Sequence, residues 1–398
     1  MTLTQTIIPF LSSWKFVVLF YAILAIVIYF NRKKFQIESG FILLYKTQFG
    51  IAFMDRFAKK HKELLKIVGY IAIGVGFIGM LAISGLLIKG LYDLIFVPAA
   101  PATLSLVIPG VQIPGSPIFI PFWYGIIALF IVIVFHEFGH GIIAKAHGLN
   151  IKSTGFGFMG PLPLAFVEPD EKEVVKTDSV VQHSIFAAGP FFNVILVGII
   201  LLLSMFILNP IISTMVNAQG VSFATVQDNY PAAQYGIEKN VAYNTVNGIE
   251  VKSSDEFVKA LSCVKPNETV VIGNSNKSIS VITGVSPSDK TKGYLGVSGI
   301  STNYKLKSEA TWFKGIYYLL FMLTTLLEWV ATLSLGIGLA NLLPLGPVDG
   351  GRMINKAAID INGKKKGTKI WATITIITLV TMAILIFVPI IKHVFFKI

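Results

Sequence analysis

The chain has 398 residues, of which 54% are hydrophobic and only 14% are charged, with a formal net charge of +12. Soluble globular proteins carry about 25% charged residues, so this composition excludes an ordinary soluble enzyme and also a disordered chain. The single cysteine, Cys263, excludes an internal disulfide and a cysteine-based zinc site. We therefore predict a polytopic α-helical membrane protein.

A transmembrane helix needs about 20 mostly apolar residues. Six candidate spans are centred, in chain order, on Phe16–Phe30, Ile67–Ile88, Phe122–Ala146, Ser184–Leu208, Gly315–Ala340 and Ile370–Ile391. The first lacks a preceding basic region and a small-residue cleavage site, so we interpret it as a retained span rather than a signal peptide.

Basic residues are concentrated in three segments, 32–66, 145–176 and 352–369, whereas the link between the second and third spans holds only Lys89. Positive residues favour cytoplasmic loops, so we expect these three segments on the cytoplasmic side of the membrane and both termini on the opposite side. The basic run at 59–66 is typical of an anchor at anionic lipid headgroups. The charge pattern gives no indication of a nucleic-acid partner.

The segment between the fourth and fifth spans has a different composition, rich in Ser, Asn, Asp and Lys. Alternating apolar residues predict short strands at Thr269–Ile272 and Ser278–Ile282, and Asp255–Leu261 is typical of a short helix. We therefore expect a small mixed α/β soluble domain on the outer face of the membrane.

The third span ends in the pattern H-E-x-x-H at residues 136–140. Successive helical residues are about 100° apart, so His136 and His140 share one face and offer two ring nitrogens to a single Zn²⁺. Glu137 is not a ligand in this arrangement but can take the proton of the attacking water as general base. Ionisable groups at the end of an apolar span are costly unless they are paired, metal-bound or facing water, which favours a metal site over two ordinary histidines.

A catalytic zinc site has three protein ligands and one open position, so a third ligand must come from elsewhere in the chain. The stretch Asn341–Gly351 ends the fifth span with two prolines and three glycines, and Asp349 is its only carboxylate. Irregular backbone at membrane depth is tolerated only where it is buried or lines a cavity. The charge pattern also puts this break on the same side as the H-E-x-x-H sequence. We therefore predict Asp349 as the third ligand, with an ordinary Asp-Gly turn as the alternative.

These two motifs, H-E-x-x-H and N-x-x-P-x-x-P-x-D-G, are about two hundred residues apart. Together they resemble the site-2 protease family of intramembrane zinc metalloproteases. The second proline stands one position later than the family pattern has it, while the Asn-to-Asp spacing is kept. The resemblance implies one catalytic Zn²⁺ held by His136, His140 and Asp349. It also implies that Glu137 is the catalytic base and that Asn341 lies near the scissile peptide.

Two further stretches fit this resemblance. Phe186–Asn193, in the fourth span, is similar to the family's A-G-P-x-x-N element. The amide of Asn193 needs a partner in an apolar span, and we expect it near the metal, holding substrate or an oxyanion; the alternative is a packing asparagine bonded to a neighbouring helix. For Gly155–Asp170 the resemblance implies a membrane-associated β-structure that pairs with an unwound substrate.

The outer domain resembles a PDZ module of the prokaryotic protease type in Tyr230–Ile237 and Val246–Ile249. A PDZ domain captures an extended peptide by adding it as a strand. Gly293–Val297 would then be the binding edge, although a closed, non-binding relative is equally compatible with the sequence.

The predicted organisation has four parts. Residues 1–121 form an N-terminal membrane region with two spans and a basic loop, and 122–208 a membrane core with the H-E-x-x-H and A-G-P-x-x-N helices. Residues 209–313 form the PDZ-like extracytoplasmic domain, and 314–398 a second core segment with the aspartate motif and the last span. In total we expect about six transmembrane helices.

The predicted function is zinc-dependent hydrolysis of peptide bonds in or near transmembrane segments of single-span membrane proteins, at the cytoplasmic side of a prokaryotic plasma membrane. Two alternatives remain open: a catalytically silent scaffold that binds peptides, and a metal-ion transporter. A scaffold would be expected to lack a motif residue, and a transporter to have a continuous polar path through the spans.

Overall fold

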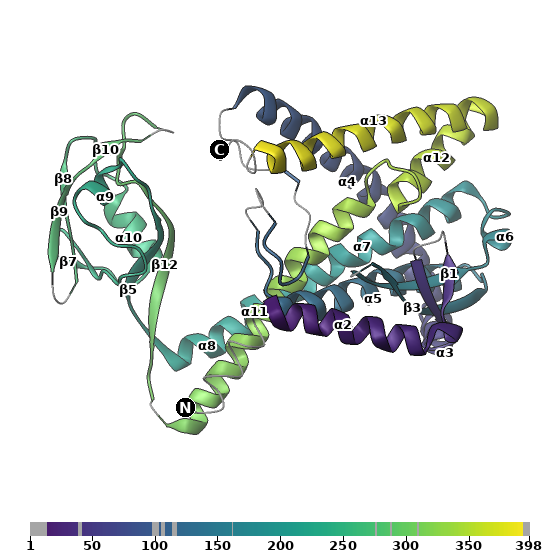
Figure 1. Ribbon diagram of the computed structural model, residues 1–398, viewed down its shortest axis with the longest axis horizontal. Helices are drawn as coiled ribbons and strands as arrows, with labels where there is room; N and C mark the ends of the chain where they lie inside the picture. Colours follow the sequence, from purple (N-terminus) through teal and green to yellow (C-terminus); the bar gives the residue numbers. More distant parts are fainter. Residues whose placement is uncertain are drawn as a thin grey trace. The chain divides into compact units, whose positions relative to one another are not determined.

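The computed structural model describes residues 14–38, 42–97, 103–104, 108–113, 118–160, 162–274, 277–286, 289–308 and 310–392 (Figure 1). The chain divides into two compact units, one of Met1–Ser204 with Leu323–Ile398, and one of Met205–Met322. Each unit is described by itself. The termini, whose side of the membrane was predicted from charge, lie outside the described residues.

Within the described residues, five helices are long and apolar enough to cross a membrane: α4 (Lys62–Phe96), α5 (Phe122–Ala146), α7 with its continuation (Ser179–Met215), α11 (Thr311–Asn341) and α13 (Lys364–Ile391). They coincide with the second to sixth predicted spans, whose helical structure is confirmed. The first corresponds to α2 (Trp14–Phe30), which has 17 residues and is shorter than the other five. Whether α2 crosses the membrane stays a prediction.

Helix α4 is longer than predicted because charged residues do not end it. In α4, Lys66 pairs with Glu63 in the first turn and Lys89 pairs with Asp93 in the last turn. Pairs three or four residues apart on a helix stabilise it rather than break it. Helix α7 (Ser179–Leu203) continues through a π-helical turn, η2 (Ser204–Leu208), into α8 (Asn209–Met215).

An antiparallel four-stranded sheet belongs to the first unit, in the order β1-β2-β3-β4. Its strands are β1 (Gln36–Glu38), β2 (Ile42–Thr47), β3 (Ile151–Met159) and β4 (Leu162–Pro169). The hairpin of β3 and β4 confirms the β-structure expected within Gly155–Asp170. The strands β1 and β2 were not predicted, because β2 pairs with a strand about 110 residues later and has no local partner beyond β1.

Three helices outside the long spans were not predicted: α3 (Ile51–Lys60), the short α6 (Glu171–Val174) and α12 (Asp349–Asn362), while a short 3-10 turn, η1 (Arg32–Lys34), follows α2. Apolar residues of α3 pack against α5, and α12 packs against α7 and α13. Both α3 and α12 mix basic and apolar residues, so the sequence alone did not distinguish them from cytoplasmic loops.

Helices α4, α5 and α7 meet through small residues in the core of the first unit (Figure 1). Ala72, Ala144, Ala187 and Ala188 are fully buried there. Small side chains let helix backbones approach closely, which favours tight packing in a lipid environment. This close approach determines which side chains of α5 face α7, and so positions the site described below.

The second unit contains a long antiparallel pair, β5 (Val216–Val226) with β12 (Val297–Leu306), and a sheet in the order β7-β6-β8-β9. The remaining elements are β6 (Thr245–Val246), β7 (Ile249–Glu250), β8 (Thr269–Gly273), β9 (Ser278–Ile282), β10 (Gly284–Val285), β11 (Gly293–Tyr294), α9 (Pro231–Gln234) and α10 (Ser254–Leu261). Phe223 and Phe257 are fully buried in its core. The two strands and the helix predicted in this segment are confirmed.

Candidate metal centre

His136 and His140 lie on one face of α5, as their spacing predicted. Their Nε2 atoms are 3.2 Å apart, and both rings point at Asp349, the first residue of α12. The Oδ2 atom of Asp349 is 3.2 Å from Nε2 of His136 and 3.4 Å from Nε2 of His140. One donor atom from each of the three residues lies within 4.8 Å of the others. The structure therefore brings together the three predicted ligands from segments about two hundred residues apart.

The backbone after α11 explains how Asp349 reaches the histidines. Helix α11 ends at Asn341, the chain turns through 342–348, and α12 begins at Asp349. A Cβ on Gly350 would overlap the carbonyl oxygen of Leu342, so only glycine lets the start of α12 lie this close to the end of α11. The first turn of α12 also places the carboxylate at the positive end of a helix dipole.

The surroundings of these three residues fit a bound metal ion. Oδ2 of Asp349 is buried and accepts no hydrogen bond from the residues that the structure describes, an expensive arrangement for a carboxylate oxygen unless a cation completes it. Gly189 of α7 lies directly beside the imidazoles, and a Cβ there would overlap Nε2 of both histidines. Two imidazole nitrogens and one carboxylate oxygen form a ligand set that is typical of catalytic zinc.

Contacts behind the ligands orient the two rings. Nδ1 of His140 lies 2.7 Å from the carbonyl oxygen of Ile185, which can only accept a hydrogen bond. The proton of His140 therefore sits on Nδ1, and Nε2 presents its lone pair to the centre of the group. Such outer hydrogen bonds are the usual means of fixing a metal-binding histidine.

Asn193, one turn after Gly189 on α7, performs the corresponding contact for His136. Its amide Nδ2 is 3.2 Å from Nδ1 of His136, and its Oδ1 is buried with no partner. The positions of the oxygen and nitrogen in an asparagine amide are assigned from its hydrogen bonds, so the two can be exchanged where the partners require it. Turning the amide by 180° lets Nδ1–H donate to Oδ1, which satisfies the oxygen and leaves Nε2 of His136 free for a metal. The structure thus places Asn193 beside the metal ligands, as predicted, and in contact with one of them.

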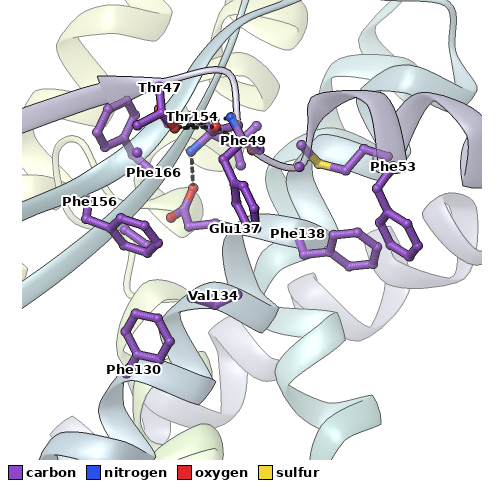
Figure 2. Close-up of a pocket in the computed structure, with 15 residues that line it drawn as sticks. Thr47, Phe49, Phe53, Phe130, Val134, Glu137, Phe138, Thr154, Phe156 and Phe166 are labelled. Atoms are coloured by element: carbon purple, nitrogen blue, oxygen red, sulfur yellow. Dashed lines mark hydrogen bonds between the residues drawn. The ribbon is translucent and has the colours of Figure 1, made fainter.

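Glu137 faces a different side of α5. Its Oε2 accepts a hydrogen bond of 2.9 Å from the backbone N–H of Val167 on β4. Figure 2 shows this carboxylate between the rings of Phe156 and Phe130 on one side and Phe138 on the other, in the wall of a pocket. The predicted base therefore lies between the helix that carries the histidines and the edge strand of the sheet.

Two other polar residues have no contact with the three ligands among those that the structure describes. Asn341 donates from Nδ2 to the carbonyl of Ile337 on its own helix, at 3.0 Å. Its predicted place near a scissile peptide remains untested. Nε2 of His147 lies 3.3 Å from the hydroxyl of Ser184.

Sequence reasoning missed the parts of the site that are not side-chain ligands. The carbonyl of Ile185 and the N–H of Val167 are backbone groups, which no residue pattern reveals. Gly189 lies in the A-G-P-x-x-N element, and the close contact it allows is the physical reason for a glycine there. The signal available in the sequence was the spacing of Gly189 and Asn193, four residues apart in one apolar span. This spacing indicates one helix face that packs closely against the H-E-x-x-H helix.

The chain was compared with known proteins. The model of peptidase family M50 matches residues 124–385, about two thirds of the chain. The chain belongs to peptidase family M50. All three clustered ligands and Glu137 lie inside the segment that the family model matches.

Similar proteins occur in at least three organisms. An uncharacterised protein of Methanocaldococcus jannaschii is 26% identical over 349 residues, covering 85% of this chain and 84% of its own length. A Campylobacter jejuni protein with the provisional name of a zinc metalloprotease is 26% identical over 313 residues, covering 59% of this chain and 82% of its own. The zinc metalloprotease RasP of Geobacillus kaustophilus is 29% identical over 148 residues, covering 33% of this chain and 32% of its own.

Proposed function

We propose that this member of family M50 is a zinc-dependent endopeptidase that hydrolyses peptide bonds in or near transmembrane segments of single-span membrane proteins. The observation that carries the proposal is the meeting of His136 and His140 with the unpartnered carboxylate oxygen of Asp349. Both histidines lie in the second half of α5, a helix long and apolar enough to cross a membrane. The zinc-metalloprotease names of two relatives add support.

The residues divide the chemistry between them. A bound Zn²⁺ would polarise the scissile carbonyl and lower the pKa of the attacking water. His136, His140 and Asp349 would hold the ion. Glu137 accepts the water proton and delivers it to the leaving amine. Asn193 acts behind His136 as a positioning residue, a role that we favour over the predicted contact with substrate or an oxyanion. Asn341 keeps its proposed place near the scissile peptide.

The sheet supplies a place for an unwound substrate. β4 is the last strand in the order β1-β2-β3-β4, so its outer edge has no partner strand within the described part of the sheet. The N–H of Val167 on that edge is used by Glu137 rather than by β3. An extended substrate that pairs with β4 would lie beside Glu137, and it would expose backbone carbonyls that a helix hides.

The charge pattern supports an orientation. Residues 32–66, 145–176 and 352–369 carry most of the basic residues around the helices, so the metal centre would lie near the cytoplasmic side of a prokaryotic plasma membrane. The second unit, which resembles a PDZ module in sequence, would then lie outside and bind an extended peptide. Both placements are proposals that epitope accessibility in sealed vesicles would test.

The alternative functions make different demands on the same residues. A silent scaffold is disfavoured because both histidines, the glutamate and the aspartate are all present and gathered. A metal-ion transporter needs polar side chains along its path. The described pocket beside Glu137 is instead lined mostly by aromatic and aliphatic side chains.

The test is cleavage by the purified, full-length protein in liposomes, with tagged single-span peptides as substrates. We expect cleavage that a zinc chelator abolishes and that added zinc restores. Glu137→Gln should retain zinc, measured by elemental analysis, and lose cleavage. Cleavage that survives in this variant, or that is indifferent to the chelator, would refute the proposed mechanism.

A further inference from the structure

The pocket that Glu137 shares is bounded by three elements of the first unit. α5 forms its floor, the strands β2, β3 and β4 form its roof, and the start of α3 closes one side (Figure 2). Its volume is about 330 Å³. A dry protein cavity of ~150 Å³ already holds a benzene ring. The pocket therefore has room for a large side chain.

The walls select apolar occupants. Phe130 of α5 stacks with Phe156 of β3 at a ring-centroid distance of 5.6 Å, and both rings line the pocket. The two hydroxyls in the lining are already satisfied. Thr154 donates to the carbonyl of Phe49 at 2.7 Å, and Thr47 donates to the carbonyl of Thr154 at 3.1 Å. Neither asks for a polar partner, so burial of an apolar group is the favourable use of this space.

The pocket adjoins the proposed general base, Glu137. Glu137 directly follows the ligand His136 in α5 and lines the pocket itself. A general base must come within about 3 Å of the proton it transfers, directly or through one water. The side chains that flank the scissile bond must therefore lie within a few ångströms of this wall. Ala165 and Val167, which line the pocket from β4, connect it to the strand edge proposed to pair with substrate.

We propose that this pocket is a specificity subsite that receives one bulky apolar or aromatic side chain of the substrate, next to the bond that is cut. The proposal rests on the proposed peptidase function, and it adds a substrate preference that the metal centre does not determine. Ala165 limits the pocket at the strand edge, and Phe130 limits it on α5.

Disulfide cross-linking tests occupancy without cleavage. Cys263 is the only cysteine and is exposed, so Cys263→Ser provides a cysteine-free background. Phe156→Cys is made in this background, in the full-length protein in liposomes with zinc removed. A single-span peptide carries one cysteine at successive positions. We expect one or two neighbouring peptide positions to cross-link strongly. Ile37→Cys, on β1 of the same sheet and 69% exposed, is the matched control and should show no such preference.

Cleavage by zinc-loaded protein tests selectivity. Peptides that differ at the cross-linking position are compared by kcat/KM. We expect phenylalanine or leucine to be preferred over alanine by about 10- to 100-fold, since apolar pockets discriminate by this much. Ala165→Leu should abolish the preference for the large residue, and Phe130→Ala should extend it to tryptophan. Ile37→Phe is the control and should leave the ranking unchanged.

The outcomes separate this proposal from the proposed function. Localised cross-linking without any cleavage keeps the subsite and defeats the peptidase function. Cleavage with an unchanged ranking in both pocket variants keeps the peptidase and overturns the subsite. Cross-linking spread evenly over the peptide also overturns it, and indicates that lipid chains fill the pocket instead.

Discussion

The two sides of helix α5 differ in how tightly they are built. On the histidine side, α7 lies so close that Gly189 leaves no room for a methyl group, and each imidazole has a partner behind it. On the glutamate side, β4 stands off and a pocket of about 330 Å³ remains. The metal ligands need fixed geometry, whereas a changing substrate needs space. One helix thus serves both needs because adjacent residues face different neighbours.

The largest effect is expected from removing Asp349, the proposed zinc ligand that lies far from the two histidines in the sequence. Asp349→Asn should lower zinc affinity by more than about 100-fold and abolish cleavage. Loss of a residue that only hydrogen-bonds to a ligand already lowers metal affinity by about 10–100-fold, and this variant loses a ligand itself. Zinc content after dialysis against a mild chelator measures this. Asp360→Asn is the matched control on the same helix, where the carboxylate pairs with Lys356. Unchanged zinc content in Asp349→Asn would remove Asp349 from the ligand set.

A smaller change tests the close approach of α7. Gly189→Ala should displace both imidazoles and lower zinc affinity strongly, by about the 10–100-fold typical of disturbed ligand orientation. Gly198→Ala is the control, because nothing lies within 4 Å of a Cβ built at that position of the same helix. Equal zinc binding by the two variants would show that Gly189 is not constrained by the histidines.

Asn193 sharpens the comparison by testing a contact behind a ligand. Asn193→Ala should weaken zinc binding by about 10-fold, since His136 loses the group that orients its ring. Asn193→Asp keeps an acceptor for Nδ1–H and should restore most of the affinity. Competition with a fluorescent zinc chelator gives both values. If Asn193→Ala binds zinc as tightly as the parent chain, the asparagine does not orient the ring.

The smallest effect is expected on the sheet that roofs the pocket. Glu168 of β4 accepts hydrogen bonds from Lys46 of β2 at 2.8 Å and from Ser153 of β3 at 2.6 Å. These bonds, the one from Lys46 first, hold the pKa of Glu168 below its usual value. Because the pKa is lowered in the folded state, ionised Glu168 stabilises the fold at pH values above its unfolded-state pKa. This stabilisation is lost as the pH falls through the folded-state pKa.

Glu168→Gln should therefore lower thermal stability slightly at pH 7, by under about 1 kcal/mol because the pair is partly exposed. The difference from the parent chain should disappear in acid, once the native glutamate is protonated. Melting curves at pH 7 and in acid measure it. An effect that persists unchanged in acid would assign the stability to packing rather than to the ion pair.

Several residues of the site were predictable because their signals are local. His136, Glu137 and His140 follow from a four-residue spacing on one helix, and five of the spans follow from apolar runs of sufficient length. Asp349 was predicted because it is the only carboxylate in the stretch that breaks the fifth span. The strands β1 and β2 were missed because β3, the second partner of β2, lies far away in the sequence. The helix α12 was missed because it mixes basic and apolar residues, as loops do.

The sequence by itself determined that the chain is rich in membrane-length helices and that one of them carries two imidazoles on a single face. It also determined that an aspartate follows a broken helix. Only the tertiary structure decided that Gly189 closes the metal centre, that Asn193 contacts His136, and that Glu137 faces an aromatic pocket. Periodicity reports the direction of a side chain from its own helix axis. What that side chain meets depends on long-range packing of α5 against α7 and β4, which no local pattern encodes.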